Sequence, residues 1–149
     1  TWLQNHLLLF DTSIQHVSGE IHDKIWQQFY DHDEQVIQGL DLIRDAGLSM
    51  ASAIHDEDIS QVINSMRMVM LGIDLIDEKL HDPFRDVLTP LEEIGSVLAW
   101  KAMGAGGGGI VGVLVEGGEY AKSSLIQATE SVGWTQLQWE IEYSGINQQ

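Results

Sequence analysis

The segment Gly104-Ala105-Gly106-Gly107-Gly108-Gly109 constrains the fold of this chain more than any other part of its sequence. Glycine loses more backbone freedom on folding than any other residue, so five glycines in six positions are costly to order. Such a run indicates backbone with positive φ angles, or backbone that lies close against another group. One use is a nest, in which successive N–H groups converge on an anion.

Two common phosphate-binding fingerprints do not fit this segment. Gly104, Gly106 and Gly109 have the spacing of the dinucleotide motif, but that motif follows a strand and opens a helix. Here a helix is predicted before the loop and a buried apolar strand, 110–115, after it. A P-loop would need Lys and Ser or Thr where this chain has Ile110 and Val111. The remaining interpretations are a turn that allows close packing and a phosphate-facing loop of another family.

Hydrophobic periodicity along the rest of the chain predicts an α+β layer sandwich in a single domain. The third predicted helix begins at Thr89 as N-cap, with Pro90 in the first helical position. The predicted elements are a strand over 7–10, helices over 17–46, 59–80 and 89–101, a strand over 110–115, a helix over 119–132 and a strand over 134–143.

The charge balance excludes several classes of function. The 149 residues, about one domain's length, contain 23 acids and 7 bases, for a net charge of −16. A basic nucleic-acid-binding surface and electrostatic docking to anionic lipid are therefore excluded. The chain has no cysteine, which excludes disulfides and thiolate metal sites. No apolar run approaches the roughly 20 residues of a membrane helix, and no targeting signal is evident, so we expect a cytoplasmic protein.

The six histidines and five tryptophans do not by themselves indicate a metal or ligand site. No histidine pair has the spacing of a zinc site, so we expect no metal, and we expect solvated positions for the histidines beside carboxylates. His81, next to Asp82, is included in that expectation. The tryptophans are expected in the core or at an interface. They are Trp2, Trp26, Trp100, Trp134 and Trp139.

Residues 99–113, Ala-Trp-Lys-Ala-Met-Gly-Ala-Gly-Gly-Gly-Gly-Ile-Val-Gly-Val, resemble the third motif of the GHMP kinases. That motif is a helix ending in Gly-x-Lys-x-Ser/Thr-Gly-Ala-Gly-Gly-Gly-Gly, followed by an apolar strand. Lys101 and the glycines match it. Met103 stands where Ser or Thr is usual, and no Gly precedes Lys101.

A second likeness lies near the start of the chain. Residues 7–21 are similar to the strand and turn that open the C-terminal half of the heptose-phosphate and fucose kinases, with the pattern Leu-Leu-x-Tyr-Thr-Gly-x-x-Arg-x-Ser. Thr12 and Ser18 match the pattern, Ser13 replaces its Gly, and His16 replaces its Arg.

The resemblance implies that residues 1–149 form the C-terminal domain of a two-domain kinase acting on a hydroxyl of a sugar or sugar phosphate. This domain is a ferredoxin-like sandwich elaborated with extra helices. The N-terminal domain, which carries the Pro-x-x-x-Gly-Leu-Gly-Ser-Ser phosphate loop and the catalytic residues, is expected outside this chain, which begins at Thr1 rather than Met.

The resemblance also implies where ligands lie. ATP and Mg²⁺ belong to the intact enzyme, and neither is expected to bind this chain alone. Thr12, His16 and Ser18 are the residues expected on the substrate side. The residues expected near the ATP phosphates are Lys101, Gly104, Ala105, Gly106, Gly107, Gly108 and Gly109.

Two further expectations concern partners and an alternative function. Apolar surface normally covered by the N-terminal domain would favour homodimers or other association. The alternative is a non-catalytic, ferredoxin-like regulatory module that uses the glycine loop for a small ligand or a partner.

Overall fold

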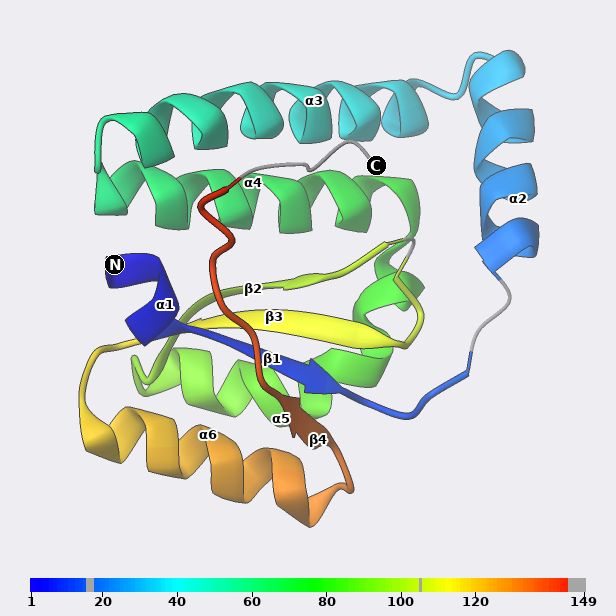
Figure 1. Ribbon diagram of the computed structural model, residues 1–149. Helices are drawn as coiled ribbons and strands as arrows, with labels where there is room; N and C mark the ends of the chain where they lie inside the picture. Colours follow the sequence, from blue (N-terminus) through cyan, green and yellow to red (C-terminus); the bar gives the residue numbers. More distant parts are fainter. Residues whose placement is uncertain (16–17, 105, 145–149) are drawn as a thin grey trace.

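A four-stranded antiparallel sheet forms the centre of the protein, with helices on both faces (Figure 1). The computed structural model describes residues 1–15, 18–104 and 106–144. The strands are β1 (Leu7–Asp11), β2 (Val97–Ala102), β3 (Ile110–Val115) and β4 (Thr135–Leu137). The helices are α1 (Trp2–His6), α2 (Ser18–Tyr30), α3 (Glu34–His55), α4 (Ile59–Asp77), the short 3₁₀ helix η1 (Glu78–His81), α5 (Asp82–Glu93) and α6 (Glu119–Ser131).

The sheet has the strand order β2-β3-β1-β4. Helices α2 to α5 connect β1 to β2, a hairpin connects β2 to β3, and α6 connects β3 to β4. This is the β-α-β-β-α-β arrangement of ferredoxin-like folds, with the first crossover enlarged by extra helices. The predicted α+β, ferredoxin-like fold class is confirmed.

Each face of the sheet is covered by a different pair of helices (Figure 1). Alternate residues of a strand point to opposite faces, so Val113 packs against α5 and α6 while Leu114 packs toward α3 and α4. Trp100 is the largest fully buried side chain and lies in the cluster formed with α5 and α6. On the other face α4 lies against β2, where Arg67 Nε donates to the Leu98 carbonyl at 2.9 Å.

Helices α3 and α4 form an antiparallel pair that crosses at two glycines. A Cβ atom built on Gly39 would lie 2.5 Å from the Gly72 carbonyl oxygen, and one on Gly72 would lie 2.7 Å from the Gly39 oxygen. The two backbones are therefore in direct contact, which no residue with a side chain would allow.

The helix predicted over 89–101 is wrong. Helix α5 begins at Asp82, with Pro83 in its first turn and Pro90 inside it, and ends at Glu93. Gly95 has a φ of +77° and turns the chain, so that residues 97–102 form the buried strand β2. The glycine loop therefore joins two strands of a hairpin, whereas the sequence predicted a helix before it.

Two other boundaries differ from the predicted ones. The helix predicted over 17–46 is two helices, because Asp33 accepts from the N–H groups of Gln35 and Val36 and begins α3 as its N-cap. The predicted end at Ala46-Gly47 lies inside α3, which continues to His55. The final strand is confirmed over only three residues, 135–137.

One helical stretch in the described part of the chain, Ile59–Glu93, is long and apolar enough to cross a membrane by length and composition. Buried core helices pass the same test, and this stretch contains α4, which lies between α3 and the sheet.

Candidate functional site

The glycine loop connects β2 to β3 at one end of the sheet (Figure 1). The expected positive φ angles are confirmed at Gly104 (+100°), Gly106 (+87°), Gly107 (+78°) and Gly109 (+74°). L-residues with side chains rarely adopt this region, so the loop conformation explains the glycine content. Ala105 lies outside the described residues.

The inner side of the loop is held by the fold itself. The Gly107 N–H donates to the Leu80 carbonyl at 2.8 Å, and the Gly109 N–H donates to the Ile14 carbonyl at 3.0 Å. A Cβ atom on Gly108 would lie 2.5 Å from that Ile14 oxygen. In this conformation the Gly107 and Gly109 N–H groups are engaged inside the protein, so they do not point into an anion nest.

The outer side of the loop is open. Gly104 is exposed, and no atom lies within 4 Å of the position a Cβ would take there. The strand ends beside it also reach solvent, with Met103 38% exposed and Ile110 37% exposed. Any ligand or second domain that meets this loop would therefore meet Met103, Gly104 and Ile110 first.

Lys101 is half-buried on β2, three residues before Gly104. Its register partner on β3 is Gly112, which leaves room on that face of the sheet for longer side chains. The Lys101 ammonium donates to the Ala102 carbonyl at 2.8 Å and forms no ion pair with any described carboxylate. Burial lowers the pKa of Lys101. Lys101 is therefore a partly desolvated cation in a strongly acidic protein.

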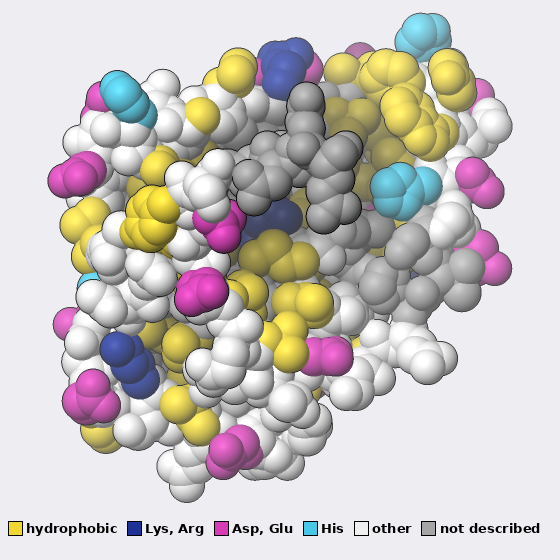
Figure 2. Space-filling model, in the orientation of Figure 1, with side chains coloured by type: hydrophobic (Ala, Val, Ile, Leu, Met, Phe, Trp, Pro, Cys, Tyr) yellow, Lys and Arg dark blue, Asp and Glu magenta, His cyan; other side chains and the backbone are white. Residues whose placement is uncertain are grey.

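Lys101 and Gly104 line a pocket of about 290 Å³ between the sheet and helices α2, α3 and α4. The other walls are almost entirely apolar. Figure 2 shows hydrophobic side chains gathered where α2 meets the adjoining end of α3. The remaining lining residues are His22, Ile25 and Trp26 of α2, Leu40 and Ile43 of α3, Val69, Ile73 and Ile76 of α4, and Leu80 of η1.

The structure brings one of the three expected substrate-side residues to the loop. Thr12 is buried, and its hydroxyl donates to the Gly109 carbonyl at 2.8 Å and accepts from the Ile14 N–H at 3.3 Å. Thr12 therefore anchors the loop to the end of β1. Ser18 is the first residue of α2, while its side chain and the whole of His16 lie outside the described part.

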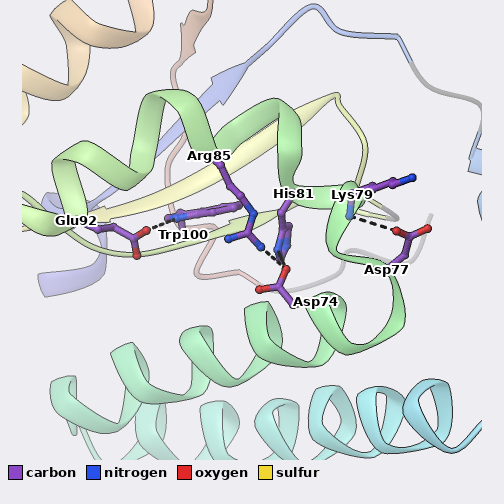
Figure 3. Close-up of polar contacts among 7 residues, drawn as sticks. All are labelled: Asp74, Asp77, Lys79, His81, Arg85, Glu92 and Trp100. Carbon is purple, nitrogen blue, oxygen red and sulfur yellow. Dashed lines mark hydrogen bonds and ion pairs between the residues drawn. The ribbon is translucent and has the colours of Figure 1, made fainter.

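A polar cluster that the sequence did not predict lies beneath β2 (Figure 3). Oδ1 of Asp74 accepts from His81 Nδ1 at 2.6 Å and from Arg85 Nη2 at 2.5 Å. The rings of His81 and Trp100 pack edge to face, with their centroids 4.8 Å apart. Nε1 of Trp100 donates to the Glu92 carboxylate at 2.9 Å. Two polar side chains, His81 and Glu92, thus contact one buried indole, and Asp74 connects His81 to Arg85.

The expectation that His81 is solvated is wrong, because His81 is fully buried. Desolvation lowers the pKa of His81, while the hydrogen bond and the charge of Asp74 oppose that shift. A sequence signal for this position exists: His81, Phe84 and Leu88 have the i, i+3, i+7 spacing of a buried helix face.

The described residues contain no group of three or more His, Asp or Glu side chains that could hold a metal ion. Of the tryptophans expected at packing surfaces, Trp100 and Trp134 are buried, while Trp26 is 52% exposed.

Comparisons with known proteins show a likeness of structure but none of sequence. No protein-family model and no curated protein matches the sequence. Among solved structures, the chain is similar to the crystal structure of a Lin0012 protein from Listeria innocua, with a TM-score of 0.72 and 16% sequence identity. The match covers 90% of this chain and 38% of that chain. At this identity the likeness shows the fold alone. In the Lin0012 protein, the matched part is little more than a third of the chain.

Proposed function

We propose that this chain is the C-terminal lobe of a GHMP-type kinase that transfers the γ-phosphoryl group of ATP to a hydroxyl of a sugar or sugar phosphate. The observation that carries the proposal is the glycine hairpin, which is anchored on its inner side and open at Met103 and Gly104. The ferredoxin-like fold, with helices added in its first crossover, is the second support. The occurrence of this fold within a longer chain is the third.

In this proposal the loop supports one wall of the cleft and does not itself surround the phosphates. Phosphoryl transfer depends on positioning the reactants and neutralising charge, so a loop fixed at Leu80 and Ile14 can hold one wall of a cleft at a constant position. Gly104 presents bare backbone to that cleft, and Lys101 supplies the nearest positive charge along the chain.

ATP and Mg²⁺ fit this chain only in part. Lys101 and the open Gly104 backbone suit a phosphate, but the described residues provide no cluster of magnesium ligands. When bound, MgATP supplies the phosphoryl group and a charge that stabilises its transfer. The proposal therefore assigns most of the nucleotide contacts to a second lobe, as the primary partner of this chain.

The first test is the coding sequence upstream of Thr1. A Pro-x-x-x-Gly-Leu-Gly-Ser-Ser segment within about one domain's length supports the proposal, whereas an unrelated domain there contradicts it. The two-lobed protein is then assayed for ADP release with a panel of free and phosphorylated sugars.

A matched pair of variants tests the loop itself. Gly104 and Gly133 both have positive φ and no atom within 4 Å of an added Cβ, so alanine imposes a similar backbone strain at each. Gly104→Ala is expected to lower kcat at least tenfold, while Gly133→Ala, at the end of α6, leaves kcat unchanged. Equal kinetics in the two variants would remove the loop from the proposed cleft.

A specific observation favours the non-catalytic alternative as the second candidate. The apolar pocket beside Lys101 lies within this chain and requires no second lobe. Calorimetry of the 149-residue chain with MgATP tests the kinase proposal, which expects little affinity without the second lobe.

A further inference from the structure

The pocket beside Lys101 is partly open to solvent and has the lining of a small-molecule site. Three helices and β2 surround a volume of about 290 Å³, close to the lower end of the range for ligand pockets. Ligand sites are commonly apolar with a few polar groups that fix orientation. Here the apolar walls come from α2, α3 and α4, and the polar groups are Lys101 and His22.

The wall formed by α2 is not packed as a core helix. This helix stands at the edge of the molecule in Figure 1, and no α2 residue is among the fully buried hydrophobic side chains of the described chain. It is connected to α4 by the ion pair between Lys24 and Asp77, at 2.6 Å. Trp26 lines the pocket although half of its surface is exposed to solvent.

Lys101 contributes an ammonium group to the lining of the pocket. A lysine offers three N–H donors, and within the described part of the chain Lys101 uses one of them, to the Ala102 carbonyl. No described carboxylate pairs with it, although acids outnumber bases 23 to 7 in the chain. An anion that enters the pocket would therefore meet an ammonium that no carboxylate of residues 1–15, 18–104 or 106–144 pairs with.

We propose that this pocket binds a small molecule with an apolar body and a single anionic head, a carboxylate or a phosphate, which pairs with Lys101. The apolar body lies between α2 and the α3–α4 pair, against Ile25, Ile43 and Ile73. Binding in this pocket needs neither ATP nor a second lobe, because all the lining residues belong to this chain. The pocket shares Lys101 and Gly104 with the cleft wall of the proposed kinase, but its test does not depend on phosphoryl transfer.

Calorimetric titration of the 149-residue chain with three eight-carbon probes tests the proposal. Octanoate and octyl phosphate carry an anionic head on alkyl chains of seven and eight carbons, whereas 1-octanol has the octyl chain without the charge. We expect saturable binding of one anionic probe per chain, at least tenfold tighter than 1-octanol. The tighter of the two anions identifies the head group. Equal affinity for 1-octanol and both anions, or no saturable binding of any probe, overturns the proposal.

Three variants locate the binding. Lys101→Met removes the ammonium and keeps an unbranched side chain one atom shorter. It is expected to weaken octanoate binding at least tenfold without changing 1-octanol binding. Lys122→Met, on α6 on the other side of the sheet, is the matched control and should bind as wild type. Ile25→Trp fills the pocket from α2 and should weaken all three probes.

The same variants can also contradict the proposed binding site. Octanoate affinity that is unchanged in both Lys101→Met and Ile25→Trp places binding elsewhere and overturns the proposal. Far-ultraviolet circular dichroism checks that each variant is folded. If Lys101→Met does not fold, Ile25→Trp and the comparison of octanoate with 1-octanol in the wild-type chain decide the outcome.

Discussion

Nδ1 of His81 lies 2.6 Å from Oδ1 of Asp74, in a fully buried position against the ring of Trp100 (Figure 3). Because a carboxylate only accepts hydrogen bonds, Nδ1 carries the proton of the imidazole. Nε2 is buried and has no hydrogen-bond partner in the described structure. The geometry therefore favours a neutral ring with a fixed tautomer, which agrees with the lowered pKa of His81.

Protonation of His81 should make the protein less stable in mild acid. The unfolded chain binds the proton near pH 6.5, and the folded chain binds it only at lower pH. His81 therefore contributes fully to the unfolding free energy above pH 6.5. This contribution is lost as the pH falls toward the pKa of His81 in the folded chain, by at most about 1.36 kcal/mol per pH unit. Urea denaturation at pH 7.5, 6.5 and 5.5 measures this loss.

The control is His81→Asn, which places an amide donor near Asp74 but does not titrate. We expect this variant to be less stable than wild type at pH 7.5 and the difference to shrink at pH 5.5. All other histidines and carboxylates are present in both proteins. A difference that stays constant with pH would contradict the assignment of a neutral, buried His81.

Asp74 should contribute more to stability than an exposed aspartate. Asp74→Ala removes the acceptor of His81 and Arg85 and leaves a buried N–H unpaired, which costs about 1–3 kcal/mol. Asp45→Ala, at an exposed ion pair with Arg44, should change the unfolding free energy by less than about 0.5 kcal/mol. Thermal and urea unfolding compare the two variants, and similar losses would show that the cluster adds nothing beyond a surface pair.

The contact between α3 and α4 provides a second matched comparison within one helix. Gly39→Ala forces a methyl group within 2.5 Å of the Gly72 carbonyl oxygen, so the helices must separate, and overpacking of this kind costs about 1–3 kcal/mol. Gly47→Ala has open space and should stabilise the protein by about 0.5–1 kcal/mol, because alanine favours the helix. Urea denaturation measures both changes. Destabilisation by Gly47→Ala, or no loss with Gly39→Ala, would contradict this description of the crossing.

Much of the fold could be predicted from periodicity and composition. The strand at 110–115, the helices at 59–77 and 119–131 and the start of α4 after Asp58 follow local rules of apolar spacing and capping. Strand β2 could not be predicted in this way, since Val97 and Leu98 also continue a helical stripe after Pro90. The decisive signal was Gly95, whose positive φ ends the helix, and its role becomes clear only when β2 is paired with β3.

The candidate site was predicted in part, because its contacts are distant in the sequence. The positive φ angles of the loop follow from glycine chemistry alone. By contrast, Leu80 and Ile14, which hold Gly107 and Gly109, show no local pattern that marks them as partners. The burial of His81 likewise depends on Asp74, seven residues earlier, and on Trp100, nineteen residues later in a strand that was predicted as helix.

The hydroxyl of Thr12 should hold the glycine loop in place. It is buried, donates to the Gly109 carbonyl at 2.8 Å and accepts from the Ile14 N–H, so Thr12→Val removes two hydrogen bonds with little change in volume. Loss of these bonds in a buried site should lower the unfolding free energy by about 1–3 kcal/mol. Thr12→Ser keeps the hydroxyl and should lose less. Hydrogen exchange of the Gly109 amide, which donates to Ile14, should accelerate in Thr12→Val more than in Thr12→Ser. Faster exchange in Thr12→Ser than in Thr12→Val would show that the methyl group of Thr12, rather than its hydroxyl, fixes the loop.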